Sequence, residues 1–297
     1  MSGRRHRPLI LGFLCYLLAA PFAWAASVEY VGTYVWSLPG EDFGGFSGIE
    51  VSDDGNGFHI ISDRAWIRWG TFERDSAGRI RGLQMAGRAN LQDSQGQALQ
   101  PGWLGDSEGL AMDASGGIWI SFEGLNRIAH YDNVDRPAIR IDSPDDWKDM
   151  PVNEGFEGLA ITPDGALLTL PEYVADGSET RPVWRYRNGE WDQPFSVSAE
   201  PQWQAVGADI GPDGRFYLLE RNFRGLLGFS SRIRRFSLDE NGLGNDEILL
   251  ETNSLQYDNL EGIAVWQDGL GIRMTMISDS NFLPFQRTEL VEYRVIE

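Results

Sequence analysis

One short unit occurs five times in this sequence, and the repetition limits the fold more than any other feature. Each copy has an apolar run, a turn rich in Gly and Asp, a second apolar run and then an acidic residue. The copies are "FSGIEVSDDGNGFHIISDR" (46–64), "DSEGLAMDASGGIWISFEG" (106–124), "GFEGLAITPDGALLTLPEY" (155–173), "AVGADIGPDGRFYLLERNF" (205–223) and "NLEGIAVWQDGLGIRMTMISDSNF" (259–282). Their anchor glycines, Gly48, Gly109, Gly158, Gly207 and Gly262, lie 61, 49, 49 and 55 residues apart. A period of about 40 to 50 residues is typical of propeller blades.

Each unit contains the pattern of four strands. Alternating β-branched and aromatic residues such as Ile118, Trp119 and Ile120, bounded by Asp-Gly or Gly-Gly turns, are typical of antiparallel hairpins. A second pair of strand-like runs follows, for example "VWRYRNGEWDQPFSV" after the third copy. The sequence therefore predicts an all-β fold, a single β-propeller with five four-stranded blades. Six blades would result if the first unit and the N-terminal segment were divided differently, and a β-sandwich would give no reason for the repeat.

The two ends of the chain supply the strands that the last blade needs. The fifth unit is followed by a single further strand, "TELVEYRVIE" (288–297), and the N-terminal strand "VEYVGTYVWSL" (28–38) belongs to no unit. Pairing the two would complete the fifth blade and remove two exposed strand edges. We therefore expect a ring that is closed by strands from both termini.

The first 25 residues have the features of a secretory signal peptide. Three arginines precede an apolar run from Leu9 to about Ala20 and an Ala-Trp-Ala cleavage site. The run is shorter than the roughly 18 apolar residues of a membrane helix, and no later segment approaches that length, so we expect no membrane insertion after cleavage. Residues 1–25 would be removed, and residues 26–297 would form one domain in the periplasm or outside the cell. Cys15, the only cysteine, lies in the leader, so the mature chain would have no disulfide.

Charge and composition exclude several classes of function. The net charge of the full sequence is -19, from 25 basic and 44 acidic residues, and an acidic chain repels nucleic acid and attracts cations. Lys148 is the only lysine, and His59 and His130 are the only histidines after the leader. A histidine-rich zinc site is therefore excluded, and any catalysis must rely mainly on carboxylates, arginines and tyrosines. We expect a monomer without a nucleic-acid partner.

Acidic residues recur at the ends of the repeated hairpins. Glu157 and Glu172 are symmetric about the turn of the third hairpin, and Glu108 and Glu123 about the turn of the second, so each pair should lie opposite in its hairpin. The first strand of a propeller blade lines the central channel, so these acids should meet at one mouth of it. The other hairpins contribute equivalent acids, Asp63, Glu220, Glu261 and Asp279, with Asp209 just inside the fourth.

Converging carboxylates repel one another unless something compensates their charge. A hard cation such as Ca²⁺ is one candidate, because it prefers oxygen ligands, and Asn126, Asn222 and Asn281 could assist. The arginines Arg64, Arg127 and Arg221 are the other candidate, because they can pair with the acids. The acids could instead form salt bridges and cap loops at blade junctions. The expected metal ligands are Asp63, Glu108, Glu123, Glu157, Glu172, Glu220, Glu261 and Asp279.

The repeated blocks resemble a known family. "SGIEVS", "SEGLAMD" with "WISFEG", "NEGFEGLAITPDG" with "LLTLPE", and "LLERNF" are similar to the phytase-like domain, also described as having esterase-like activity of phytase. The resemblance covers essentially the whole chain after the leader. It implies an exported β-propeller with a hydrolase role, distantly similar to calcium-dependent propeller phytases and lactonase-type propellers. The fourth unit departs from the pattern at Val206, where the other units carry Glu or Ser.

Two functions from different classes follow, so the sequence leaves open whether the protein is an enzyme. The first is a Ca²⁺-assisted hydrolase of a small phosphate or carboxyl ester, with Glu108 and Glu157 at the reaction centre. Arg64, Arg127 and Arg221 would neutralise developing negative charge. The second is a non-catalytic binding or scaffold propeller that captures a cation or a small ligand. A lactonase or glycosidase that uses a carboxylate pair is a further alternative.

Overall fold

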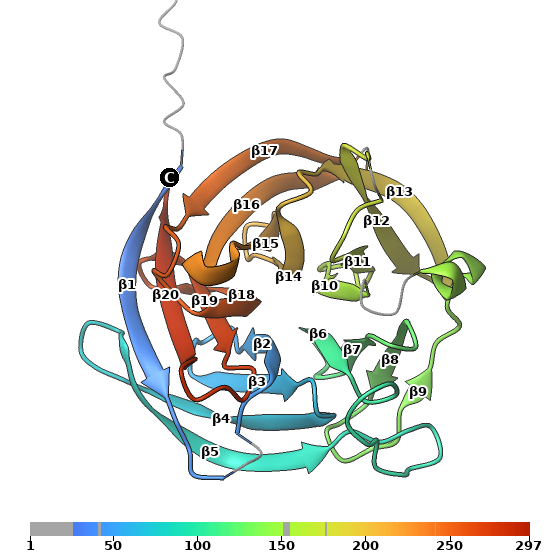
Figure 1. The fold of residues 1–297 in the computed structure, drawn as a ribbon, viewed down its shortest axis with the longest axis horizontal. Coiled ribbons are helices and arrows are strands. Elements are labelled where there is room, and N and C mark those ends of the chain that lie inside the picture. Colours follow the sequence, from blue (N-terminus) through green and yellow to red (C-terminus); the bar gives the residue numbers. More distant parts are fainter. Residues whose placement is uncertain (1–25, 41–42, 151–154, 176, 241) are drawn as a thin grey trace, which may run out of the picture.

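The computed structural model describes residues 26–40, 43–150, 155–175, 177–240 and 242–297. In this part of the chain, twenty strands form five four-stranded antiparallel sheets that surround a central channel (Figure 1). The structure thus confirms a single β-propeller with five blades rather than six. The predicted leader at 1–25 lies outside the described residues.

The blades follow the sequence repeats, and the first strand of each blade is the innermost. Blade 1 comprises β2 (Phe46–Val51), β3 (Gly57–Ser62), β4 (Trp66–Arg74) and β5 (Ile80–Asn90). Blade 2 comprises β6 (Ser107–Met112), β7 (Ile118–Phe122), β8 (Arg127–Tyr131) and β9 (Ile139–Arg140). Blade 3 comprises β10 (Phe156–Ile161), β11 (Leu167–Pro171), β12 (Thr180–Arg187) and β13 (Glu190–Ser198), after the short 3-10 helix η1 (Asp145–Asp149).

The last two blades have the same order. Blade 4 comprises β14 (Gln204–Ile210), β15 (Phe216–Phe223), β16 (Phe229–Asp239) and β17 (Gly242–Glu251), with the 3-10 helix η2 (Gly225–Leu227) between β15 and β16. Blade 5 comprises β18 (Asn259–Asp268), β19 (Gly271–Asp279), β20 (Thr288–Ile296) and the N-terminal strand β1 (Ser27–Trp36). Strands β1 and β20 pair antiparallel from Ser27 opposite Ile296 to Trp36 opposite Thr288, which confirms the predicted closure.

Apolar layers between adjacent blades form the core. Alternate residues of one strand point to opposite faces, so Leu218 packs toward blade 3 while Leu219 packs against Ile263 of blade 5. Between blades 5 and 1, Trp36 stacks on Phe46 with ring centroids 5.1 Å apart. Inner strands are therefore apolar on both faces, which explains the unbroken apolar runs of the repeats.

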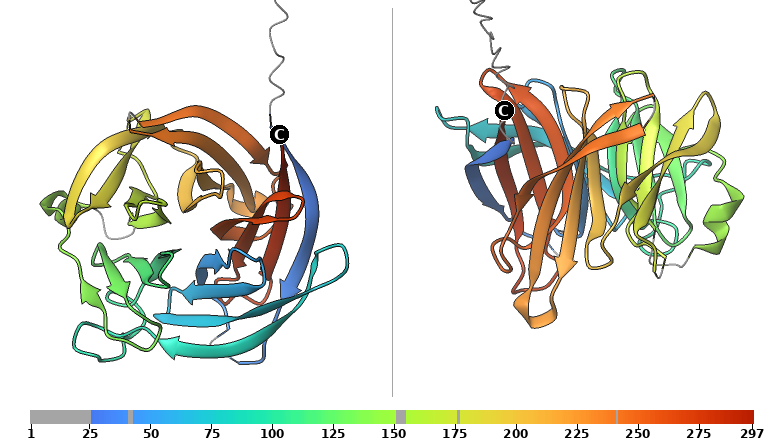
Figure 2. Two further views of the ribbon diagram at one scale, coloured as in Figure 1. Left: turned by 180° about the vertical axis from the view of Figure 1, so that it is seen from behind. Right: turned by 90° about the horizontal axis from the view of Figure 1, so that it is seen from above.

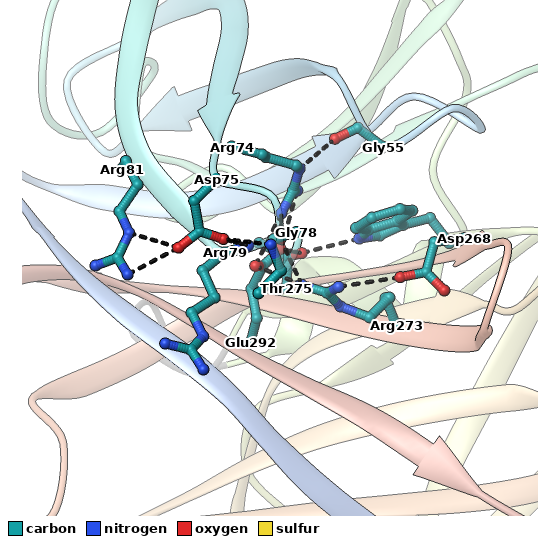
Figure 3. A network of polar contacts seen from close by, with 12 residues as sticks. Gly55, Arg74, Asp75, Gly78, Arg79, Arg81, Asp268, Arg273, Thr275 and Glu292 are labelled. Carbon is teal, nitrogen blue, oxygen red and sulfur yellow. Dashed lines mark hydrogen bonds and ion pairs between the residues drawn. The ribbon is translucent and has the colours of Figure 1, made fainter.

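A buried ionic cluster also joins blade 5 to blade 1 (Figure 3). The Glu292 carboxylate on β20 accepts hydrogen bonds from Arg74 of β4 at 2.9 and 3.0 Å and from Arg273 of β19 at 2.6 Å. The hydroxyl of Thr275 donates to the same carboxylate at 2.9 Å. Glu292 and Arg273 are each 1% exposed. The strand that completes the ring is thus held to the first blade by charge as well as by apolar packing.

Removing the carboxylate of this cluster should weaken the ring closure. Glu292→Gln removes the anion of the half-buried Arg74 and leaves the buried Arg273 with Asp268 alone, and breaking a buried pair in this way costs about 3 to 5 kcal/mol of unfolding free energy. Chemical denaturation measures the loss. Arg81→Ala, which removes an exposed pair with Asp75 drawn in the same figure, is the matched control and should leave the midpoint nearly unchanged. Equal midpoints for Glu292→Gln and the parent protein would contradict this role.

Candidate functional site

Each inner strand carries a β-bulge at the same place. In blade 3, Phe156 pairs with Pro171 and Gly158 with Leu170, so Glu157 has no partner of its own. The same shift in register occurs just before the anchor glycine in blades 1, 4 and 5, and in blade 2 it spans Glu108 and the anchor glycine. The side chains at the bulges belong to Ser47, Glu108, Glu157, Val206 and Glu261. A bulge re-aims its side chain, so Glu157 does not lie directly opposite Glu172 as the sequence suggested.

A second ring of side chains comes from the ends of the second strands. Glu172 donates its backbone N–H to Gly155 at 2.9 Å, and Glu123 donates to Asp106 at 2.8 Å in the same way. The residues at this position are Asp63, Glu123, Glu172, Arg221 and Asp279. Four blades therefore present a carboxylate at this mouth, which we call the acid mouth, and blade 4 presents an arginine.

The carboxylates of blades 2 and 3 form two groups that share one member. In the first group, ligand oxygens of Asp106, Glu108 and Glu123 lie within 4.8 Å of one another. In the second, those of Glu123, Glu157 and Glu172 do so. Glu123 thus stands between the two groups. The sequence did not predict Asp106 as a ligand, because it lies two residues before Glu108 and outside the repeated pattern of acids. In the structure Asp106 is the backbone neighbour of Glu123.

Arg221 bridges two carboxylates of the acid mouth, one in blade 3 and one in blade 5. Its guanidinium donates to Glu172 and to Glu261 at 2.5 Å each, and to the amide oxygen of Asn259 at 3.0 Å. Burial lowers the pKa of Arg221, but the carboxylates of Glu261, Glu157 and Glu172 raise it by more, so the group stays charged. Of the three predicted arginines, Arg221 is the one that pairs with the predicted acids.

The structure places the other predicted cationic groups at the rim. Arg64 is exposed and lies 3.5 Å from the ring centroid of Phe282. Arg127 lies over the ring of Phe122 and donates to backbone carbonyls, including that of Leu125 at 3.2 Å. Neither side chain contacts a carboxylate in the described part of the chain.

Glu220 is not part of the acid mouth. It pairs in register with Ala205, one residue before the position that Arg221 fills, so it points between blades 3 and 4. There the carboxylate is fully buried and contacts Arg232 at 2.7 Å, Arg234 at 3.2 Å and Arg181 at 3.4 Å. Glu220 therefore forms a buried salt-bridge network, which is the structural alternative that the sequence left open.

The predicted asparagines take three different positions. Asn281 donates its backbone N–H to Asp279 at 2.9 Å, and Asn222 pairs with Ser230 on the projecting end of blade 4. The amide oxygen of Asn126 is buried and has no hydrogen-bond partner in the described part of the chain. A Cβ built on Gly155 would lie 2.9 Å from this oxygen and 3.0 Å from Cγ of Glu123, so the two side chains lie side by side.

Burial and mutual repulsion raise the pKa of the clustered carboxyls. Burial, and then the charges of Glu157 and Asp106, hold the pKa of Glu108 well above its usual range. Burial and Glu172 do the same for Glu157. Burial raises the pKa of Glu261 to about 8 and that of Glu123 to about 7. Burial is the largest cause of each shift, and the neighbouring carboxylates add to it at Glu108 and Glu157.

The rest of the channel is separated from the acid mouth by a narrow neck. The neck is a space of about 10 Å³ lined by Glu157 and by the anchor glycines of the other four blades. Beyond it lies a cavity of about 1290 Å³, bordered by the hairpin turns and by Glu50. Asp209 lies on this side and accepts backbone N–H groups of Val265 at 2.5 Å and Ile210 at 2.7 Å. A ligand would therefore reach the clustered carboxylates from the acid mouth rather than through the large cavity.

The chain belongs to the Phytase-like family, described as esterase-like activity of phytase, which matches residues 41–282. A similar solved structure is the PQQ-bound form of an aldose sugar dehydrogenase from Streptomyces coelicolor, with 14% identity, a TM-score of 0.51, and coverage of 92% of this chain and 99% of that chain. Another is a catalytically inactive virginiamycin B lyase from Staphylococcus aureus with quinupristin, with 16% identity, a TM-score of 0.44, and coverage of 89% and 88%. At 14% identity, the likeness to the aldose sugar dehydrogenase shows a shared fold alone. No curated protein sequence matches the chain.

The raised pKa values predict that stability without metal falls as the pH rises. Glu123 and Glu261 keep a proton in the folded state up to about pH 7 and 8, whereas unfolded glutamates ionise near pH 4.3. Between these values the folded state binds more protons than the unfolded state, so its stability decreases with pH. The thermal midpoint in chelator should be higher at about pH 5.5 than at about pH 8.

A variant pair assigns this pH dependence to the acid mouth. Glu261→Gln removes one carboxyl whose pKa is raised, so the thermal midpoint should change less between the two pH values. Glu190→Gln alters an exposed carboxyl on β13 and should preserve the change. A midpoint that rises from the lower to the higher pH would show that the clustered carboxyls do not repel as described.

Proposed function

We propose that the acid mouth binds Ca²⁺ and hydrolyses a small phosphate or carboxyl ester. The observation that carries the proposal is the pair of carboxylate groups that share Glu123, with ligand oxygens within 4.8 Å of one another. The donor set suits a hard divalent cation, because every candidate ligand is an oxygen. The unpartnered amide oxygen of Asn126 beside Glu123 would be satisfied by the same ion. Membership of a family described as esterase-like supports the choice of reaction.

The residues around the cation site would have two roles, to bind the ion and to position its ligands. Glu108, Glu123 and Glu157 would hold the ion, with Asp106, Glu172 and Asn126 completing the shell. When bound, Ca²⁺ supplies a Lewis acid that polarises the phosphoryl or carbonyl oxygen of the ester. Arg221 holds Glu172 and Glu261 in place through its two 2.5 Å hydrogen bonds.

A carboxylate outside both groups is available as the base. Asp63 lies at the same mouth, and burial together with the charge of Asp279 raises its pKa to about 7. A base with a pKa near neutrality is well matched to take a proton from water, whose oxygen then attacks the ester. As the bond to the leaving group breaks, the protonated carboxyl would return this proton to the departing oxygen, which leaves as the alcohol. Arg64, which follows Asp63 and is exposed, could contact the anionic part of the substrate as it enters.

We also propose that the protein is exported and acts as a monomer. The leader pattern at 1–25 supports export to the periplasm or the medium. Within the described residues, none of the helices has the length and apolar character required to cross a membrane. The acidic charge argues against a nucleic-acid partner.

A non-catalytic binding propeller is the second candidate, and one observation favours it. Arg221 is already paired with two carboxylates, and Arg64 and Arg127 contact aromatic rings at the rim. Fewer guanidinium groups are therefore free to stabilise an anionic transition state than the sequence suggested. A site of this kind could capture a cation or a small cationic ligand without turning it over.

Two measurements separate these functions. Calorimetry should show Ca²⁺ binding that weakens at least about tenfold in Glu123→Gln, because this side chain belongs to both groups. Glu190→Gln is the control and should bind normally. Hydrolysis of nitrophenyl phosphate or nitrophenyl acetate should require Ca²⁺, stop in chelator, and fall at least about 100-fold in Glu157→Gln. Ca²⁺ binding without turnover would support the binding propeller, and the absence of Ca²⁺ binding would exclude the Ca²⁺-assisted hydrolase.

A further inference from the structure

The loops around the acid mouth carry an unusual number of exposed apolar side chains. Of the sixteen large apolar residues exposed in the described chain, nine lie in the loops at this mouth and a tenth, Phe223, ends the strand that leads into one of them. The other six lie on β1, β9, β17 and β20 or in the β18–β19 turn. We call the ten residues the apolar collar. Its members come from blades 2 to 5 and the connections before them, and they include Trp103, Leu125, Leu226, Leu227, Leu255 and Phe285.

The loop between β15 and β16 extends the collar away from the ring. The right-hand view of Figure 2 shows this orange loop, with η2 at its tip, projecting beyond the neighbouring blades. Leu226 and Leu227 at the tip are 103% and 61% exposed. Behind them, the rings of Phe223 and Phe229 pack 4.9 Å apart and support the loop. An apolar tip of this kind is costly in water and indicates a partner that shields it.

We propose that the acid mouth docks on a zwitterionic phospholipid surface, with the apolar collar inserted at the boundary between head groups and acyl chains. The charges of the mouth are complementary to such a surface. Its carboxylates face the ammonium groups of the lipid, and the exposed guanidinium of Arg224, beside Leu226, can contact lipid phosphate. Docking would bring the proposed site against the surface from which amphiphilic esters could enter.

A second copy of the chain fits the collar less well. A symmetric dimer would place the same patch of each subunit against the other. The carboxylate groups around Glu123 would then face each other across the interface, and like charges in a desolvated interface are unfavourable. The collar also consists of separate loop tips at different heights, as Figure 2 shows, and a fluid surface accommodates these without a matching shape.

Flotation with vesicles tests the proposal. The full protein, in chelator, should float with vesicles of phosphatidylcholine and phosphatidylethanolamine, and less with vesicles of phosphatidylglycerol, because the protein is acidic. The double variant Leu226→Asp/Leu227→Asp should reduce the bound fraction at least about tenfold. Leu270→Asp is the matched control, because Leu270 is 78% exposed in the turn at the opposite mouth, and it should bind like the parent protein.

The outcomes distinguish docking from catalysis and from self-association. Parent protein that stays with the unbound fraction, or a double variant that floats as well as the parent, would overturn the proposal. A dimer in sedimentation that the double variant dissociates, without flotation of the parent, would assign the collar to a second copy instead. The readout needs neither Ca²⁺ nor turnover, so Glu157→Gln should float normally even if it hydrolyses nothing.

Discussion

The close approach of the inner strands at their anchor glycines is the constraint on which the rest of the structure depends. A Cβ on Gly109 would lie 2.5 Å from the carbonyl oxygen of Glu157 in the next blade, and a Cβ on Gly207 would lie 2.7 Å from that of Glu261. Side chains cannot be accommodated at such distances, so only glycine allows the five inner strands to meet around so narrow a neck. The bulge before each glycine then turns one side chain toward the channel mouth. Backbone geometry, rather than attraction between side chains, brings the acids together.

This arrangement places like charges close together at the acid mouth, which is electrostatically unfavourable. The carboxylates of blades 2 and 3 are buried near one another, whereas the single arginine of the mouth, Arg221, contacts Glu172 and Glu261 on either side. Two buried acids in other parts of the fold are matched by cations, since Glu220 contacts three arginines and Glu292 contacts two. The contrast with these two sites argues that the uncompensated charge at the acid mouth serves binding rather than structure.

The sequence predicted the fold well because the repeats carry a period, a turn and an anchor glycine in each copy. The sequence also predicted that strands from both termini close the ring, because the repeats left one strand at each end of the chain without a partner strand. It could not predict the bulges, since a shift of one residue in register depends on the pairing of two strands and leaves little trace in either. The repeated acids also led to Glu220, rather than Arg221, as the expected mouth residue of the fourth hairpin, because the fourth copy carries its acid one residue earlier than the second and third copies do.

One signal in the sequence could have corrected this assignment. Glu123, Glu172 and Arg221 each lie 14 residues after their anchor glycine, whereas Glu220 lies 13 residues after it. Alignment on the glycines rather than on the acids would therefore have placed the arginine at the mouth. The contacts of Arg64 and Arg127 with aromatic rings could not have been found in this way, because they depend on loop conformation.

The central claim is that acids from separate blades share one cation-binding centre at the acid mouth. Anomalous diffraction from crystals in which a lanthanide replaces Ca²⁺ tests it most directly. The account predicts a strong peak at bonding distance from Glu123 and from carboxylates of both groups that contain it. Peaks confined to the outer strands or to the opposite mouth, with the carboxylates around Glu123 left without an ion, would contradict it.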